Sequence, residues 1–301
     1  MSEVIVFGGI NMDLFAYVPR STQEGETIEA DSIEFYLGGK GANQAVALSR
    51  LGVKVRFVAT IGSDQFGNQL ENLIKKENIN TSNMNRKEGK SGIALINVLK
   101  DGRNEVISFP SVNKKTLSQQ VSDENLQDCS ILIGQMEVEP LQTTDLFIRA
   151  KNNNCKTILN LAPFKRANNL LMENTDILIV NEIEFAELSN KKPNSIDFEF
   201  VDKTFPELDL PFGMTLVVTL GGEGVITFSH GKKQYFEGRK VKAIDTVGAG
   251  DCFVGAFGYA LLNGHDIFSA TNFANCASSI AVTRKGAAES MPSLGEVKSN
   301  I

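Results

Sequence analysis

Short runs of consecutive apolar and often β-branched residues recur along the chain and predict strands. They span residues 4–10, 55–61, 131–134, 157–161, 177–180 and 216–220. The runs are continuously apolar instead of alternating with polar residues, so we expect both faces of each strand to be covered, as in a parallel sheet.

Helical periodicity appears between several of these runs, over residues 42–51, 66–76, 141–151 and 182–189. In the second of these segments, Phe66, Leu70 and Leu73 fall on one helix face. Alternation of strands and helices is typical of doubly wound proteins, and it predicts an α/β layer sandwich.

Two stretches break the alternation. Residues 27–37 look extended, and residues 91–110 read as a hairpin with arms at 93–99 and 106–109 and a turn at Asp101-Gly102. The first arm is apolar at nearly every position, so we expect cover on both of its faces. We interpret these stretches as a small β-sheet lid, with one face over a site and the other against a second subunit. The residues alone leave open that they extend the main sheet instead. Residues 191–212 are expected to form a surface loop with a short helix.

Composition and charge narrow the function. The chain has 301 residues, with 30 Lys and Arg against 36 Asp and Glu, a formal net charge of -6. Without a basic excess, a dedicated nucleic-acid binder is disfavoured, although local main-chain amides can still hold a nucleotide phosphate. No run approaches the roughly 18 apolar residues of a membrane span, and no signal peptide is recognised, so we expect a soluble cytoplasmic protein.

The scarce metal-binding residue types limit the chemistry further. The two histidines, His230 and His265, rule out a His-rich zinc site and are expected at the surface. The four cysteines are widely spaced and form no Cys-x-x-Cys motif, so neither disulfides nor a Cys-bound metal are expected; they are Cys129, Cys155, Cys252 and Cys276.

The sharpest motif is Asp-Thr-Val-Gly-Ala-Gly-Asp at residues 245–251, which leads into a helical pattern that ends near Asn263. Small residues at a helix start let main-chain amides converge on an anion, so Gly248, Ala249 and Gly250 predict an anion hole. Asp251 lies beside it, where a carboxylate can accept a proton from an attacking hydroxyl. The alternative is that Asp251 only complements the helix dipole.

Two further glycine-rich clusters precede helical or extended segments. Residues 38–43 read Gly-Gly-Lys-Gly-Ala-Asn, where the backbone can approach a ligand and Asn43 offers both a donor and an acceptor. Residues 8–13 lie at the carboxyl end of the first predicted strand, and Asn11 and Asp13 point the same way in an extended chain, where they can accept from adjacent sugar hydroxyls. Alternatively, residues 38–43 form only a loop-to-helix junction, and residues 8–13 form only an Asx turn.

Two weaker candidate motifs lie at the ends of predicted strands. Glu184, in the Asn-Glu-Ile-Glu run at 181–184, either reaches a metal-bound water or lies on a solvated helix turn. The glycines of residues 219–224 either admit the ribose and phosphates of a nucleotide or form an ordinary hairpin turn.

Taken in order along the chain, these motifs resemble those of the PfkB family of carbohydrate kinases, together with Gly25-Glu26-Thr27 and the run at residues 281–287. The Gly-Gly-Lys-Gly-Ala-Asn-Gln-Ala run at 38–45 is similar to the branch of the family that phosphorylates ribose. The resemblance implies a three-layer α/β/α sandwich with a mainly parallel central sheet and a small β-sheet lid. The core would comprise residues 1–12, 39–90 and 111–301, and the lid residues 13–38 and 91–110, with a homodimer formed through the lid.

The resemblance also implies ATP-dependent phosphorylation of D-ribose at its 5-hydroxyl, with Asp251 as general base and Gly248, Ala249 and Gly250 around the phosphoryl group. The residues that would line the sugar are Asn11, Met12, Asp13, Gly39, Lys40, Gly41, Asn43, Glu137 and Asp251. Those that would contact ATP are Asn181, Thr219, Leu220, Gly221, Gly222, Glu223, Gly224, Gly250, Asp251 and Asn275. Glu184 would help to place Mg²⁺ through water, and a K⁺ activator would lie at Asp245, Val247, Ala281, Arg284, Gly286 and Ser290.

Other functions stay open at this point. A related kinase for deoxyribose, another pentose or adenosine would share these motifs. A non-catalytic sugar or nucleotide sensor on the same fold would have no need of a base at Asp251. A dinucleotide oxidoreductase is disfavoured because the Gly-x-Gly-x-x-Gly fingerprint is missing.

Overall fold

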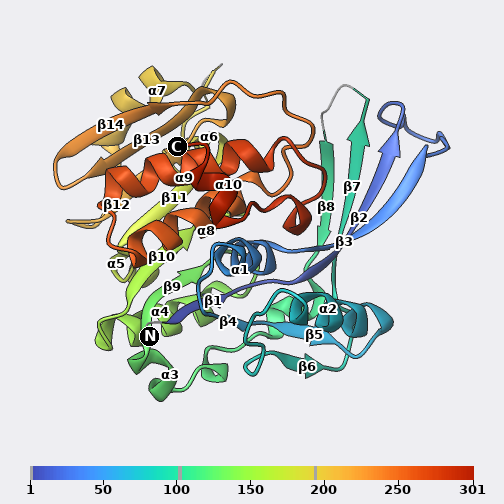
Figure 1. The fold of residues 1–301 in the computed structure, drawn as a ribbon, viewed down its shortest axis with the longest axis horizontal. Coiled ribbons are helices and arrows are strands. Elements are labelled where there is room, and N and C mark those ends of the chain that lie inside the picture. The colour runs from blue at the N-terminus through green and yellow to red at the C-terminus, as the bar shows by residue number, and fades with distance from the viewer. Residues whose placement is uncertain (1–2, 101–103, 193–194) are drawn as a thin grey trace.

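The computed structural model describes residues 3–100, 104–192 and 195–301, and its centre is an eight-stranded sheet (Figure 1). The strands, in spatial order, are β14 (Lys232–Glu237), β13 (Gly224–Ser229), β12 (Thr215–Thr219), β11 (Ile177–Asn181), β10 (Lys156–Asn160), β9 (Cys129–Gly134), β1 (Glu3–Phe7) and β4 (Val55–Val58). The strands from β12 to β4 are parallel, and β13 and β14 are antiparallel to their neighbours. The expected mainly parallel sheet is therefore confirmed.

Helices cover both faces of this sheet. Alternate residues of β1 point to opposite sides: Val4 and Val6 join one buried cluster, and Ile5 and Phe7 join the other. The first cluster packs under α1 (Lys40–Arg50), α2 (Gln65–Lys75), α8 (Ala249–Leu262), α9 (Ile267–Ala281) and α10 (Leu294–Lys298). The second packs under α3 (Asp123–Gln127), α4 (Pro140–Asn152), α5 (Asn169–Glu173), α6 (Glu182–Leu188) and α7 (Phe198–Thr204). The result is the expected three-layer α/β/α sandwich.

The two stretches that broke the alternation form a separate sheet, not an extension of the central one. Its order is β3 (Ser32–Gly38), β2 (Asn11–Val18), β7 (Gly92–Leu99) and β8 (Asn104–Phe109), and it projects from the core at the right of Figure 1. The hairpin arms match β7 and β8, while the turn expected at Asp101-Gly102 lies outside the described residues. The strand β2 was not foreseen.

The faces of this small sheet differ in exposure. Leu14 pairs with both Phe35 and Leu95, and Leu95 pairs with Ile107, so this row of apolar side chains crosses all four strands on one face. Phe35, Leu95 and Ile107 are exposed on this face of the chain. The cover expected there was a second subunit, which stays a prediction. The opposite face is covered, because Phe15, Ala94 and Ile96 form a small buried cluster there.

Two predicted strands were too long. The run at 4–10 ends as a strand at Phe7, because Gly8 and Gly9 turn the chain into the small sheet. The run at 55–61 divides at Ala59: β4 belongs to the central sheet, whereas β5 (Thr60–Gly62) pairs with β6 (Asn85–Lys87). A continuous apolar run does not reveal such a change of partner, because both strands are buried.

Candidate active site

The predicted site motifs meet where the order of the parallel strands reverses. The strand β1 lies between β4 and β9, although β4 follows β1 in the chain and β9 follows β4. Ligands of open α/β sheets bind in the crevice at the carboxyl ends of strands at such a switch point. Gly8 and Gly9 follow β1, and Gln135 and Glu137 follow β9 at the same edge.

One wall of the site is polar and closely packed. Glu137 accepts hydrogen bonds from the main-chain amide of Lys40 at 2.8 Å and from Asn11 Nδ2 at 3.5 Å. Two glycines leave room for these carboxylates: a Cβ at Gly9 would lie 2.4 Å from Glu137 Oε2, and one at Gly38 would lie 1.9 Å from Asp13 Oδ2. Gly9 and Gly38 are therefore needed because a larger residue at either position would collide with a carboxylate of the site.

Asn113 is a residue of this wall that the sequence analysis missed. Its Nδ2 donates to Asn11 Oδ1 at 2.7 Å, and its Oδ1 accepts from the amide of Ile10 at 3.1 Å. Asn113 is buried in a 3-10 turn directly after β8, where nothing in the local sequence distinguishes it from an ordinary turn residue. It fixes the orientation of the Asn11 amide.

Asp251 lies in the first turn of α8 and is only 4% exposed. Its Oδ2 accepts from Asn43 Nδ2 at 2.9 Å, and its Oδ1 accepts from Gln44 Nε2 at 2.9 Å. The helix begins after Gly248, whose φ of 79° is one that residues with a side chain rarely adopt. A carboxylate is thus held by two amide donors at the positive end of a helix.

The main-chain amides of this turn differ from the predicted set in one respect. The amide of Ala249, expected to face an anion, donates to the carbonyl of Thr246 at 3.3 Å, and that of Cys252 donates to Gly248 at 2.8 Å. A Cβ built at Gly250 would meet no atom within 4 Å, so Gly250 faces open space. The Ala249 amide is thus engaged in the turn, and Gly250 lines the cavity described below.

Charges accumulate around Lys40. Burial raises the pKa of Asp13 well above its usual value, and the nearby carboxylates Glu137 and Asp251 raise it further while Lys40 opposes them. Burial also raises the pKa of Glu137 to about 6. The Asp251 carboxylate, in turn, raises the pKa of Lys40. Lys40 thus offsets part of the negative charge of these carboxylates.

Two buried acceptors of this group of side chains have no donor among the described residues: Asp13 Oδ1 and Asn43 Oδ1. A buried acceptor without a partner is costly, so these atoms are suited to hydroxyl groups of a polar ligand. Of the other residues predicted to line a sugar, Met12 packs into the core on the face of β2 opposite Asp13. A Cβ at Gly39 or Gly41 would lie within 3 Å of main-chain atoms of residues 8–11, so both permit close packing of the backbone.

A cavity of about 470 Å³ adjoins the start of α8. The residues predicted to contact ATP that line it are Asn181, Thr219, Gly221, Gly222, Gly224, Gly250 and Asn275. Leu220, Glu223 and Asp251 do not line it. Leu220 is buried in the core, Glu223 is exposed with its carbonyl accepting from the Gly238 amide, and Asp251 is buried against Asn43 and Gln44. Residues 221–223 form the turn between β12 and β13, so this segment is a hairpin turn that also borders a cavity.

A small cavity of about 50 Å³ is lined by Lys40, Glu184 and Gly250, among other residues. Glu184 also caps α6, because its Oε2 accepts from the Asn181 amide at 2.9 Å while Asn181 Oδ1 accepts from the Glu184 amide at 2.8 Å. Burial raises the pKa of Glu184. No group of three or more His, Cys, Asp or Glu residues able to hold a metal occurs in the described part of the chain. A carboxylate beside an anion site nevertheless suits a hydrated Mg²⁺ that is also held by phosphates.

The two segments expected to hold K⁺ come together beside α8. Asp245 accepts from the amides of Val247 and Gly286, both at 3.0 Å, and the Asp245 amide donates to the Val282 carbonyl at 3.2 Å. The Arg284 side chain pairs with Glu296, so only its main chain is available to a cation. Carboxylate and carbonyl oxygens are the ligands that a hard cation takes.

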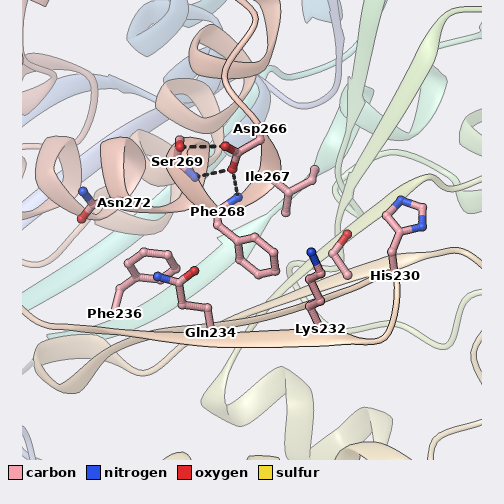
Figure 2. Close-up of a pocket in the computed structure, with 10 residues that line it drawn as sticks. His230, Lys232, Gln234, Phe236, Asp266, Ile267, Phe268, Ser269 and Asn272 are labelled. Carbon is pink, nitrogen blue, oxygen red and sulfur yellow. Dashed lines mark hydrogen bonds between the residues drawn. The ribbon is translucent and has the colours of Figure 1, made fainter.

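Another hollow of the surface, about 730 Å³, lies elsewhere, between β14 and the start of α9 (Figure 2). None of the predicted site residues lines it. Its carboxylate, Asp266, is already engaged as the cap of α9, accepting from the amides of Phe268 and Ser269 at 2.9 Å. His230 lies at its rim and is exposed, as is His265, in agreement with the sequence analysis. The described residues include no helix long and apolar enough to cross a membrane.

Comparisons with known proteins agree with this architecture. The model of the pfkB family carbohydrate kinases matches residues 1–294. Ribokinase of Haemophilus influenzae is 36% identical over 305 residues, covering 97% of this chain and 95% of the relative. The crystal structure of ribokinase from Thermotoga maritima has a TM-score of 0.87 and 33% identity, with 99% of both chains covered. Ribokinase of Arabidopsis thaliana, complexed with ribose and ATP, has a TM-score of 0.87 and 27% identity, covering 99% of this chain and 98% of that one.

Proposed function

This chain belongs to the pfkB family of carbohydrate kinases, and we propose that it transfers the γ-phosphoryl group of ATP to the 5-hydroxyl of D-ribose, giving D-ribose 5-phosphate and ADP. One observation carries the proposal: Asp251, buried in the first helical turn of α8, accepts a hydrogen bond from Asn43, and its neighbour Gly250 lines the cavity that the nucleotide motifs share. The ribose-and-ATP complex of the Arabidopsis relative supports the choice of substrates.

The acceptor-rich pocket is the proposed sugar site. Asp13 and Asn43 offer the buried acceptors without donors, and Asn11 and Glu137 complete the polar wall. Ribose presents several hydroxyl donors on one small ring, which matches such a set. The covered face of the small sheet lies on the side of Asp13, so we propose that residues 13–38 and 91–110 act as a lid that excludes water.

The transfer step follows from the position of Asp251. Its carboxylate accepts the proton of the attacking hydroxyl as the oxygen approaches the phosphorus atom. The amides of Gly248, Ala249 and Gly250 and the ammonium group of Lys40 stabilise the charge that develops on the phosphoryl oxygens. This assignment requires the Ala249 amide to exchange its 3.3 Å bond to Thr246 for a phosphoryl oxygen.

The cavity of about 470 Å³ is the proposed nucleotide site, with Asn275 and the glycines of residues 221–224 at its walls. Glu184 would hold Mg²⁺ through water, and the metal would neutralise phosphate charge when bound. The oxygens of Asp245, Val247, Ala281, Arg284, Gly286 and Ser290 would hold K⁺ behind the anion site. A cation there strengthens the positive potential at the start of α8.

We also propose a homodimer formed through the uncovered apolar face of the small sheet. Ile33, Phe35, Leu95, Ile107 and Phe109 are each at least 45% exposed on that face. An apolar patch shared by neighbouring strands is typical of an interface.

The four cysteines are all free thiols, which suits the reducing cytoplasm, the location that we propose.

The proposal is tested by measuring ADP release from ATP and Mg²⁺ with a panel of pentoses, hexoses and nucleosides, each in K⁺ and in Na⁺. We expect the highest kcat/KM with D-ribose and faster turnover in K⁺. A preference for deoxyribose, another pentose or adenosine would replace the substrate but keep the reaction. Ligand binding without any ADP release would favour a sensor. Equal rates in K⁺ and Na⁺ would contradict the cation site.

A further inference from the structure

We propose that Gln44 is a positioning residue for Asp251 and that Gln135 fixes the orientation of the Gln44 side-chain amide. The inference rests on the proposed role of Asp251 as general base, and it extends the machinery to two glutamines that lie behind the sugar and nucleotide sites.

Gln44 follows Asn43 on α1 and is fully buried. Its Nε2 donates to Asp251 Oδ1 at 2.9 Å and to Asn160 Oδ1 at 3.1 Å. A side-chain amide nitrogen carries two hydrogens, so both are used. Asn160 sits at the end of β10 and directs its own Nδ2 to the Ile179 carbonyl at 3.3 Å, which leaves its oxygen facing Gln44.

The orientation of the Gln44 amide matters because its two ends have opposite character. Turned over, it would place an oxygen against the Asp251 carboxylate. Gln135, also fully buried, opposes this by donating from Nε2 to Gln44 Oε1 at 2.6 Å. Gly8 makes the contact sterically feasible, since a Cβ at that position would lie 1.9 Å from Gln135 Oε1.

The hydrogen bonds from Gln135 to Gln44 and from Gln44 to Asp251 give the two oxygens of the Asp251 carboxylate different environments. Oδ1 is held from behind by Gln44, whereas Oδ2 accepts from Asn43, which belongs to the sugar pocket. The remaining lone pair of Oδ2 would then accept from the substrate hydroxyl. Gln44 thereby holds Oδ1 in place while Oδ2 accepts the proton.

This arrangement predicts a specific kinetic signature. Gln44→Met keeps the length of the side chain and removes the donor. We expect kcat to fall about 10- to 100-fold, because one hydrogen bond to a charged group is lost. The KM values for ribose and ATP should stay within about threefold. The acidic limb of the plot of log(kcat/KM) against pH should move upward by about one unit, since the ionised form loses a donor.

Gln135→Met should move kcat and the acidic limb in the same direction by a smaller amount, and it should add little when combined with Gln44→Met. Gln120→Met is the matched control, because Gln120 Nε2 donates to the carbonyls of Ala59 and Asn83 at 3.0 and 2.8 Å, outside the site. It should lower stability without moving the limb.

The charged groups that face Asp251 from the surrounding elements are Lys40, Glu137, Asp13 and Glu184. All of them are retained in every variant, so a shift between variants reports the loss of the glutamine donor. Should Gln44→Met fail to fold, Gln44→Glu keeps the shape of the side chain and sets an acceptor against the carboxylate, and the limb should then move further upward.

A direct measurement separates this inference from the proposed function. The pKa of the Asp251 carboxyl group is followed by carbon NMR in the wild type and in Gln44→Met without any substrate. A higher pKa in the variant supports the positioning role of Gln44 even if ribose proves to be the wrong substrate. An unchanged carboxyl pKa together with an unchanged acidic limb would overturn it. A wild type that phosphorylates no sugar of the panel would overturn the proposed function alone.

Discussion

The side-chain amide of Asn43 donates to Oδ2 of Asp251 at 2.9 Å, although 208 residues separate them in the chain. The contact is possible because α1 and α8 pack closely where Gly255 faces Ala47: a Cβ at Gly255 would lie 2.6 Å from the Ala47 Cβ. A residue proposed to hold the sugar therefore also orients the proposed base, so substrate binding and proton acceptance share one hydrogen bond.

The first prediction concerns that base. Asp251→Asn removes the proton acceptor and keeps the size of the side chain. We expect turnover to fall at least about 1,000-fold, while the affinities for ATP and ribose stay within about tenfold. Calorimetric titration of both ligands and a coupled assay of ADP release measure the two effects separately. Near-wild-type turnover in this variant would remove the assignment of Asp251.

The second prediction concerns Asn113, which holds Asn11 by its amide group. Asn113→Leu leaves the buried amide of Ile10 without its acceptor and frees the Asn11 side chain to turn. We expect ribose affinity to fall about tenfold, as for the loss of one buried hydrogen bond, with ATP affinity unchanged. Asn174→Leu is the control, since Asn174 donates to the Leu170 carbonyl at 2.8 Å beside the start of β10. Equal ribose affinity in both variants would rule out this role for Asn113.

The third prediction follows from the raised pKa of Glu137. Burial raises this pKa to about 6, above its ordinary value of 4.5. The folded protein therefore binds a proton that the unfolded chain releases between these values. Stability should rise as pH falls through 6 towards 4.5, and the ionised carboxylate costs stability above 6. Glu137→Gln should raise Tm by a few degrees at pH 8 and lose this gain below about pH 5.

The same substitution should weaken sugar binding. We expect Glu137→Gln to lower ribose affinity about tenfold at pH 8, where the wild-type carboxylate is ionised and accepts strongly. The difference between the two proteins should shrink as pH falls below 6, because the wild-type group then becomes protonated. The exposed Glu173→Gln serves as control in both the melting and the binding series. A Tm that falls at pH 8 would contradict the burial cost assigned to Glu137.

The sequence predicted the elements that depend on local patterns. The buried strands, the two arms of the hairpin at residues 91–110 and the helix after Gly248 follow from apolar runs and helical spacing, and the structure contains them. The residues alone left open whether that hairpin extends the main sheet. The residues of the glycine motifs also converge on one crevice, although their catalytic roles stay predictions. Asn113 and Gln135 were missed because each acts on a partner 102 or 91 residues away and carries no local signature.

Other differences have a similar origin. The division of the apolar run at Ala59 depends on which sheet each half joins, and that choice is made by distant strands. The engagement of the Ala249 amide by Thr246 depends on the turn geometry before α8, which the Gly-Ala-Gly spacing does not specify. Sequence patterns thus locate a site more readily than they assign its individual hydrogen bonds.

The last prediction concerns the apolar face of the small sheet. Ile107 is 66% exposed on it and pairs with Leu95, whose other neighbour on the same face is Leu14. If this face forms the dimer, Ile107→Asp buries an unpaired charge at the interface, and the protein should become monomeric. Sedimentation equilibrium should give twice the monomer mass for the wild type and the monomer mass for the variant.

The matched control is Ile183→Asp, because Ile183 is 63% exposed on α6, away from the small sheet. It should leave the mass unchanged. If the lid is steadied by its partner, Ile107→Asp should also raise the KM for ribose, with a smaller effect on the KM for ATP, because β2 carries Asn11 and Asp13 whereas the small sheet contributes no residue to the lining of the nucleotide cavity. A wild type that sediments as a monomer would contradict the proposed interface, whatever the variants do.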